Sequence, residues 1–168
     1  MPPGPADTLY AAIVAEARRP QWYLAGEVPD TIDGRFDMVA LVLSLVLLRL
    51  ETEAGPDIDH PAAHLNAELT ERFISDMDGN LRQDGIGDQN VGKHIGRMVA
   101  ALGGRIGAYR EARGDDAALA EALRRNLWRG GAVPEEALAF VVREARRLSG
   151  RLDATPFATI AAGRLELA

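Results

Sequence analysis

The sequence predicts an all-α, single-domain bundle of about six to eight helices. Apolar residues recur every three or four positions through most of the chain, as on the buried face of an amphipathic helix. No stretch alternates convincingly between apolar and polar residues, so we expect no sheet. The bundle should form around a central apolar helix (about 36–52) and a helical hairpin (about 62–112). Residues 1–6 are expected to be disordered, and residues 7–168 to form the domain.

The composition excludes several classes of protein. The 168 residues include no cysteine, which rules out disulfide bonds, thiolate metal sites and cysteine nucleophiles. A net charge of −6 argues against a general nucleic-acid binder and against broad attraction to anionic lipid. Abundant arginine with almost no lysine suggests a GC-rich bacterial genome. The first ten residues lack the basic and apolar regions of a signal peptide, so we expect none.

The N-terminal third contains the longest apolar run of the chain. Asp7 or Thr8 is the expected cap of a first helix, which Pro20 ends or converts into a new short turn. The apolar run at 38–48 spans only about 16 Å as a helix, roughly half the hydrocarbon thickness of a bilayer. We therefore expect a buried helix rather than a segment that enters the membrane, and Gly55 should end it.

The hairpin is predicted from a glycine-rich break at residues 84–87. Apolar residues recur at helical spacing before it and after it, at Leu69, Phe73, Ile74, Met77 and Leu81 and then at Val91, Ile95, Met98, Leu102 and Ile106. Asp59 is the expected cap of the first helix, with Pro61 in its first turn, and Asp88 is the expected cap of the second. Glycines in the break allow φ values that other residues avoid.

Two metal-site patterns begin in this region and then fail. Residues 76–80 begin like a calcium loop, but Leu81 stands where that loop needs glycine and Gly87 where it needs glutamate. His60 and His64 lie four residues apart without the glutamate of a zinc hydrolase motif between them. We therefore assign no metal ligand, and expect these histidines to be exposed near the start of a helix.

The second helix of the hairpin has glycines close to one stripe, at Gly92, Gly96, Gly103 and Gly107. Each interior glycine costs about 1 kcal/mol relative to alanine, so the stripe predicts that another backbone approaches closely there. The favoured partner is a helix of the same domain, and an external helix is the alternative. Lys93 and Arg97 exclude a helix that lies within the membrane.

The C-terminal third shows start signals for three more helices, at Asp115 or Asp116, at Pro134 and at Thr155–Pro156. Trp128 should end the first of these helices and Gly163 the last. The chain lacks a nucleophile elbow, a P-loop and a cofactor fingerprint. Asp76 and Asp78, two residues apart, diverge on a helix, which suits no shared acid–base role. We assign no catalytic residue and no cofactor. An enzyme of unrecognised type is the third hypothesis for the function, after the two given below.

Several segments together resemble a known family. They are Val28-Pro-Asp-Thr-Ile-Asp-Gly-Arg-Phe-Asp37, Asp76-Met-Asp78 with Leu81-Arg82, Gly85-Ile-Gly-Asp88 with Val91-Gly-Lys93, Arg105 with Ala108-Tyr109, and Asn126. This combination resembles the ubiquinol–cytochrome c chaperone family, which assembles cytochrome b into the respiratory bc1 complex. The resemblance runs from about Arg18 to about Val142, most of the chain.

The resemblance implies a non-enzymatic protein that holds newly made cytochrome b or another membrane-protein client, and leaves open a second assembly factor as partner. With the net charge, which argues against a nucleic-acid partner, it leads us to expect a cytoplasmic protein that is at most peripheral to the inner membrane. The residues expected to shape or line the client surface are Arg35, Asp37, Asp78, Gly85, Gly87, Asp88, Gly92 and Lys93. Turn, cap and ion-pair roles explain the same residue types. The second functional hypothesis is a helical interaction module of another membrane complex.

Overall fold

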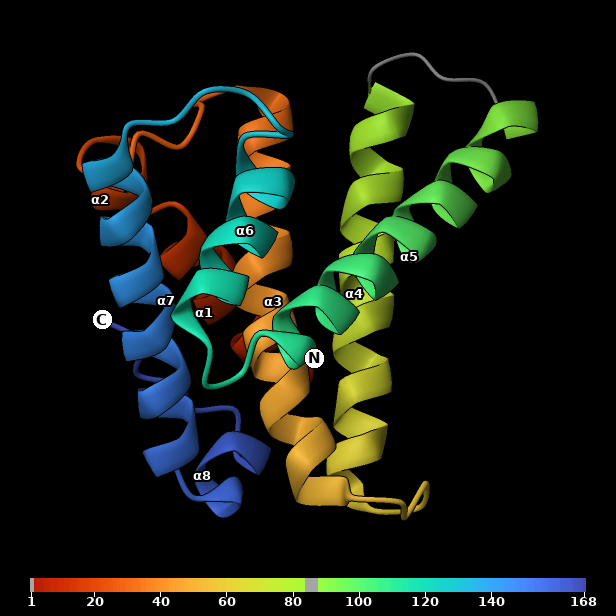
Figure 1. Ribbon diagram of the computed structural model, residues 1–168. Coiled ribbons are helices and arrows are strands. Elements are labelled where there is room, and N and C mark those ends of the chain that lie inside the picture. Colours follow the sequence, from red (N-terminus) through yellow and green to blue (C-terminus); the bar gives the residue numbers. More distant parts are fainter. Residues whose placement is uncertain (1, 84–87) are drawn as a thin grey trace.

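The described part of the chain, residues 2–83 and 88–168 of a computed structural model, forms eight α-helices and no strand (Figure 1). Side chains are described at these positions except 80–83 and 88–91. The helices are α1 (Pro5–Ala17), α2 (Pro20–Tyr23), α3 (Ile32–Ala54), α4 (Pro61–Gln83), α5 (Asp88–Glu111), α6 (Asp116–Leu127), α7 (Glu135–Ala154) and α8 (Phe157–Ala161). The all-α prediction is confirmed.

Helix α3 packs against α1, α4, α5, α6 and α7. Every residue from Asp37 to Leu50 is buried, so this helix has no exposed face along its middle. Thr31 is the N-cap, because its hydroxyl oxygen accepts a hydrogen bond from the Gly34 N–H at 3.0 Å. Gly55 ends the helix with a φ of 57°, which confirms the predicted end.

The hairpin helices α4 and α5 both pack against α3, and in Figure 1 their ribbons diverge toward the N-terminal end of α5. Pro61 is the first residue of α4, as predicted. The predicted cap at Asp59 is wrong. His60 fills that position, since its Nδ1 accepts from the Ala62 N–H at 2.9 Å. Its ring also lies 5.6 Å from that of Phe157, which ties α4 to α8.

Two further cap predictions differ from the structure at the ends of the chain, the second of them only in part. Helix α1 begins at Pro5 rather than after Asp7 or Thr8, and its Gly4 N–H donates to the Asp7 carboxylate at 3.0 Å. The start predicted at Thr155–Pro156 is confirmed for Pro156, which is the N-cap residue of α8, but not for Thr155, whose hydroxyl donates to a carbonyl of α7. Proline and glycine at these positions supply a suitable backbone geometry without a side-chain cap.

The helix starts predicted in the C-terminal third are otherwise confirmed. Asp115 caps α6, because its carboxylate accepts from the Ala118 N–H at 3.1 Å. Trp128 is the C-cap of α6, and Pro134 is the N-cap residue of α7. Within the described residues, no helix combines the length and apolarity that crossing a bilayer requires.

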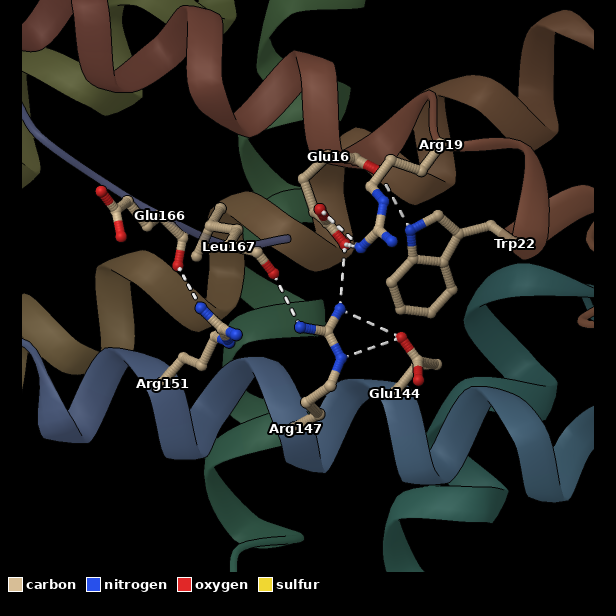
Figure 2. Close-up of polar contacts among 8 residues, drawn as sticks. All are labelled: Glu16, Arg19, Trp22, Glu144, Arg147, Arg151, Glu166 and Leu167. Atoms are coloured by element: carbon tan, nitrogen blue, oxygen red, sulfur yellow. Dashed lines mark hydrogen bonds and ion pairs between the residues drawn. The ribbon is translucent and has the colours of Figure 1, made fainter.

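The C-terminal segment is fastened to α1 and α7 by arginine side chains (Figure 2). Arg147 donates to the Leu167 carbonyl at 2.8 Å and lies within ion-pair distance of Glu144 and Glu16. Arg151 donates to the Glu166 carbonyl at 3.3 Å. Leu167 is buried and belongs to the core, whereas Glu166 and Ala168 on either side of it are exposed.

Candidate functional site

The segment from Val28 to Asp37 is a structural corner as well as a sequence motif. A Cβ at Gly34 would overlap the Pro29 carbonyl, so this position requires glycine for close approach. Arg35 is exposed and pairs with Asp30 at 2.8 Å. Among the predicted site residues, Arg35 is therefore accessible to a partner, whereas its neighbour Gly34 serves the turn.

Asp37 occupies a different environment from Arg35. Its side chain is only 1% exposed and accepts from the Arg105 guanidinium of α5 at 2.8 Å. Arg129, which follows α6, donates to both Asp37 carboxylate oxygens at 3.0 and 3.1 Å. The three side chains join α3, α5 and the end of α6 in one ion cluster. Asp37 thus holds two arginines in place and does not itself reach the surface.

Arg129 has an unusual backbone for a residue with a long side chain. Its φ is 52°, in the left-handed region where a Cβ is unfavourable. The preceding Trp128 anchors this turn, because its indole N–H donates to the Glu27 carbonyl at 3.1 Å. Hydrogen bonding to Asp37 raises the pKa of Arg129, which keeps its guanidinium charged.

An open groove of about 360 Å³ lies beside this cluster, and we call it the Arg129 groove. It is lined by Phe36, His94, Arg97, Met98, Ala101, Arg105 and Arg129. The Arg105 guanidinium lies 5.6 Å from the centre of the Phe36 ring, within cation–π range. The groove therefore combines apolar side chains from α3 and α5 with cationic groups fixed by a buried carboxylate.

The glycine stripe of α5 does not pack as predicted. A Cβ built at Gly92, Gly96, Gly103 or Gly107 would meet no described atom within 4 Å. The favoured prediction, close packing against another helix of this domain, is therefore wrong for the described residues. An external helix stays as a prediction. Lys93 is exposed on this same helix.

Of the remaining predicted site residues, the structure describes the side chain of Asp78 alone. Asp78 is half-buried on α4. Gly85 and Gly87 lie outside the described residues, as does the side chain of Asp88, the first residue of α5. The structure thus separates buried Asp37 from exposed Arg35, Gly92 and Lys93. Sequence reasoning missed Arg129 and the pairing of Arg105. An aspartate directly before the apolar run at 38–48 is the one signal in the sequence that a buried cation is needed here.

A second hollow, of about 460 Å³, lies between α1, α7 and the C-terminal segment. The Glu16 carboxylate lines it and is held by Arg19 at 3.2 Å and Arg147 at 3.5 Å (Figure 2). Burial raises the pKa of Glu16 even though both arginines oppose the shift. The contacts here hold the C-terminal segment against the helices, so we assign this region a structural role. In the described ranges, no cluster of three or more histidine or acidic residues is arranged to hold a metal ion.

Comparison with known proteins gives two matches. The family model described as ubiquinol-cytochrome C chaperone matches residues 25–167. The crystal structure of the Cbp3 homolog from Brucella abortus is similar, with a TM-score of 0.83 and 30% sequence identity, covering 97% of this chain and 90% of that chain. No curated protein matches.

Proposed function

Because the chain belongs to the ubiquinol-cytochrome C chaperone family, we propose that it assists assembly of the ubiquinol–cytochrome c reductase complex by binding newly made cytochrome b. The observation that supports this most strongly is the extent of the family match, from residue 25 to residue 167. The likeness to the Cbp3 homolog over 97% of the chain supports the same role. The role is one of binding rather than catalysis.

The exposed side of α5 is the client surface that we propose. Its glycines present backbone without side chains, and no described atom lies within 4 Å of the built Cβ positions. Transmembrane helices associate closely through such small residues, so a helix of the client can approach this face. Val99, 44% exposed, adds an apolar contact on the same helix. In Figure 1 the ribbon of α5 diverges from that of α4 toward the N-terminal end of α5.

The predicted site residues then divide by role. Gly92 and Lys93 are exposed and suit direct contact with the client. Arg35 is exposed in the first turn of α3 and suits contact at the edge of the client surface. Asp37 is buried and acts indirectly, through the arginines that it positions. We keep Asp78, Gly85, Gly87 and Asp88 as residues expected to shape the client surface.

A client made of transmembrane helices also bears on location. We propose peripheral association with the cytoplasmic face of the inner membrane, where such a client is made and inserted. The net charge of −6 disfavours recruitment by anionic lipid alone, so the client rather than the bilayer should provide the attachment. A second assembly factor would add to the surface available for the client.

The test is recovery of cytochrome b with the tagged protein from membranes solubilised in mild detergent. Wild type is compared with Gly92→Leu, which places a bulky side chain on the proposed face, and with Gly150→Leu. Gly150 is an exposed glycine of α7 that likewise has no described atom within 4 Å of a built Cβ. All three proteins must be folded. They should give the same helical circular dichroism spectrum, and their melting temperatures should differ only by the effect of the substituted side chain on α5 or α7.

Recovery with wild type and Gly150→Leu but not with Gly92→Leu is the expected result. Equal recovery with all three retains the function and removes the α5 face from it. If no form recovers cytochrome b, and deleting the gene leaves the level of the bc1 complex unchanged, the proposed function is wrong. The helical interaction module of another membrane complex then becomes the better hypothesis.

A further inference from the structure

The Arg129 groove has more cationic side chains than carboxylates that pair with them. Arg105 and Arg129 share the single carboxylate of Asp37, and Arg129 also lies 3.5 Å from the exposed Asp33. Arg97 has no ion-pair or hydrogen-bond partner among the described residues, although it lines the same groove. The local excess of cations stands out on a chain whose net charge is −6.

Two of the three guanidinium groups of the groove are held in position before any ligand arrives. Asp37 fixes Arg105 and Arg129 from beneath, and the Phe36 ring lies against the Arg105 guanidinium. The left-handed backbone of Arg129, with φ of 52°, is maintained by these contacts and by Trp128. Strained backbone held by its surroundings concentrates at binding sites, and fixed donors lose little entropy when a ligand binds.

The groove also has an apolar part. Phe36 from α3 and Met98 and Ala101 from α5 line it beside the arginines. A ligand that fits both parts has an anionic group next to an apolar group. Guanidinium pairs with carboxylate through two parallel hydrogen bonds, and methionine adapts its shape to varied apolar side chains.

We propose that the Arg129 groove binds an acidic, amphipathic peptide segment of a protein partner, with a carboxylate on Arg97 and Arg129 and an apolar side chain against Phe36 and Met98. A membrane surface is the less suitable ligand. It would require a broad basic field, whereas the net charge of the chain is −6. The inference deepens the proposed function, since it names the chemistry of a segment that the partner presents.

The test uses purified full-length protein and a fluorescent helical peptide of about 15 residues, with leucines on one stripe and glutamates flanking them. A matched peptide has glutamine at each glutamate position. The protein variants are Arg97→Ala and, as a control, Arg125→Ala on α6. Arg125 is also exposed and has no described ion-pair partner, but it lies outside the groove. Binding is measured by fluorescence anisotropy at low and high salt.

Wild type should bind the glutamate peptide about tenfold more tightly than the glutamine peptide, and high salt should reduce this difference. Arg97→Ala should weaken binding about fivefold, while Arg125→Ala should bind as wild type does. Equal binding of the two peptides, no binding of the glutamate peptide, or an unchanged affinity in Arg97→Ala would overturn the proposal.

A second assay tests whether the groove binds the anionic head groups of lipids instead of a peptide. Vesicles rich in phosphatidylglycerol are compared with phosphatidylcholine vesicles in a flotation assay. Flotation with phosphatidylglycerol that Arg97→Ala abolishes, together with no preference for the glutamate peptide, would assign the groove to lipid and reject the peptide. Because cytochrome b is absent from both assays, they can fail while its recovery through α5 succeeds, and the reverse also holds.

Discussion

Asp37 and Arg129 lie 92 residues apart in the sequence, and an Asp37 carboxylate oxygen accepts from the Arg129 Nε at 3.0 Å. Arg105 of α5 donates to the other oxygen at 2.8 Å. A single buried carboxylate thus determines how the start of α3, the middle of α5 and the end of α6 meet. The same contact positions the cationic side of the Arg129 groove, so folding and binding depend on one residue.

Asp37→Asn should lower the free energy of unfolding by about 3 kcal/mol, because it leaves two arginines without their buried counter-charge. Urea unfolding followed by circular dichroism measures this loss. Asp30→Asn is the control, since Asp30 pairs with Arg35 on the surface and its loss should cost less than about 1 kcal/mol. A small effect for Asp37→Asn would mean that the cluster contributes little to stability.

Gly34→Ala should destabilise the protein by about 2–3 kcal/mol, because the added Cβ overlaps the Pro29 carbonyl and the backbone must move. Gly150→Ala has open space and should instead stabilise α7 by about 1 kcal/mol. Thermal unfolding of both variants tests the pair. If both substitutions shift the midpoint upward, the turn before α3 tolerates a side chain and the close approach is not required.

Local signals predicted the helices well because the responsible residues act on their own neighbours. Gly55 ends α3 through its own φ, and Asp115 caps α6 three residues away. The caps that were missed use less common residues. His60 accepts from a backbone N–H through its ring nitrogen, and Gly4 precedes a proline-initiated helix with no side chain of its own. Residue-type preferences at N-caps rank glycine below aspartate and do not place histidine among the favoured residues.

The site was harder to predict because its parts come from distant segments. The pairing of Asp37 with Arg129 depends on a left-handed turn after α6, which no local pattern announces in a non-glycine residue. The glycine stripe predicts that another backbone approaches closely, but periodicity does not say whether the partner helix belongs to this chain. Placing α5 with its glycines open required the packing of α3, α4 and α6 around it.

The double substitution Gly96→Ala with Gly103→Ala should stabilise the protein by about 2 kcal/mol, since neither position meets a described atom and each glycine weakens α5. Denaturant unfolding measures the gain. The same variant should recover less cytochrome b, because two added methyl groups keep a client backbone at a greater distance. A loss of stability would show that α5 needs these glycines for its own conformation.

Arg49→Met should cost about 3 kcal/mol, because Arg49 is buried and donates to the Leu152 and Thr155 carbonyls at the C-terminal end of α7, each at 3.0 Å. Without it these carbonyls lose their charged donor. Arg110→Met removes an exposed pair with Glu51 and should cost less than about 1 kcal/mol. Hydrogen exchange should also accelerate in the last turn of α7 only for Arg49→Met, and a uniform change would argue against a local capping role.

Glu16 should make stability fall as pH rises through its titration. Burial raises its pKa in the folded state above the ordinary value of about 4.3, so the folded protein binds this proton more tightly than the unfolded chain. Its contribution is therefore fully present below the unfolded pKa and is lost as pH passes the folded one. The difference in unfolding free energy between wild type and Glu16→Gln should decrease across that window and then remain constant.

The pKa of Glu16 itself provides the more direct measurement, by NMR titration of its side-chain carboxyl carbon. Arg147→Met should raise this pKa further, because it removes a cation 3.5 Å from the carboxylate. The two arginines and burial act in opposite directions, so the measured sign decides which is larger. A wild-type pKa at or below the ordinary value would mean that Arg19 and Arg147 outweigh burial. If the pKa lies below the ordinary value, the contribution of Glu16 to the free energy of unfolding would increase, not decrease, as pH rises from acid conditions.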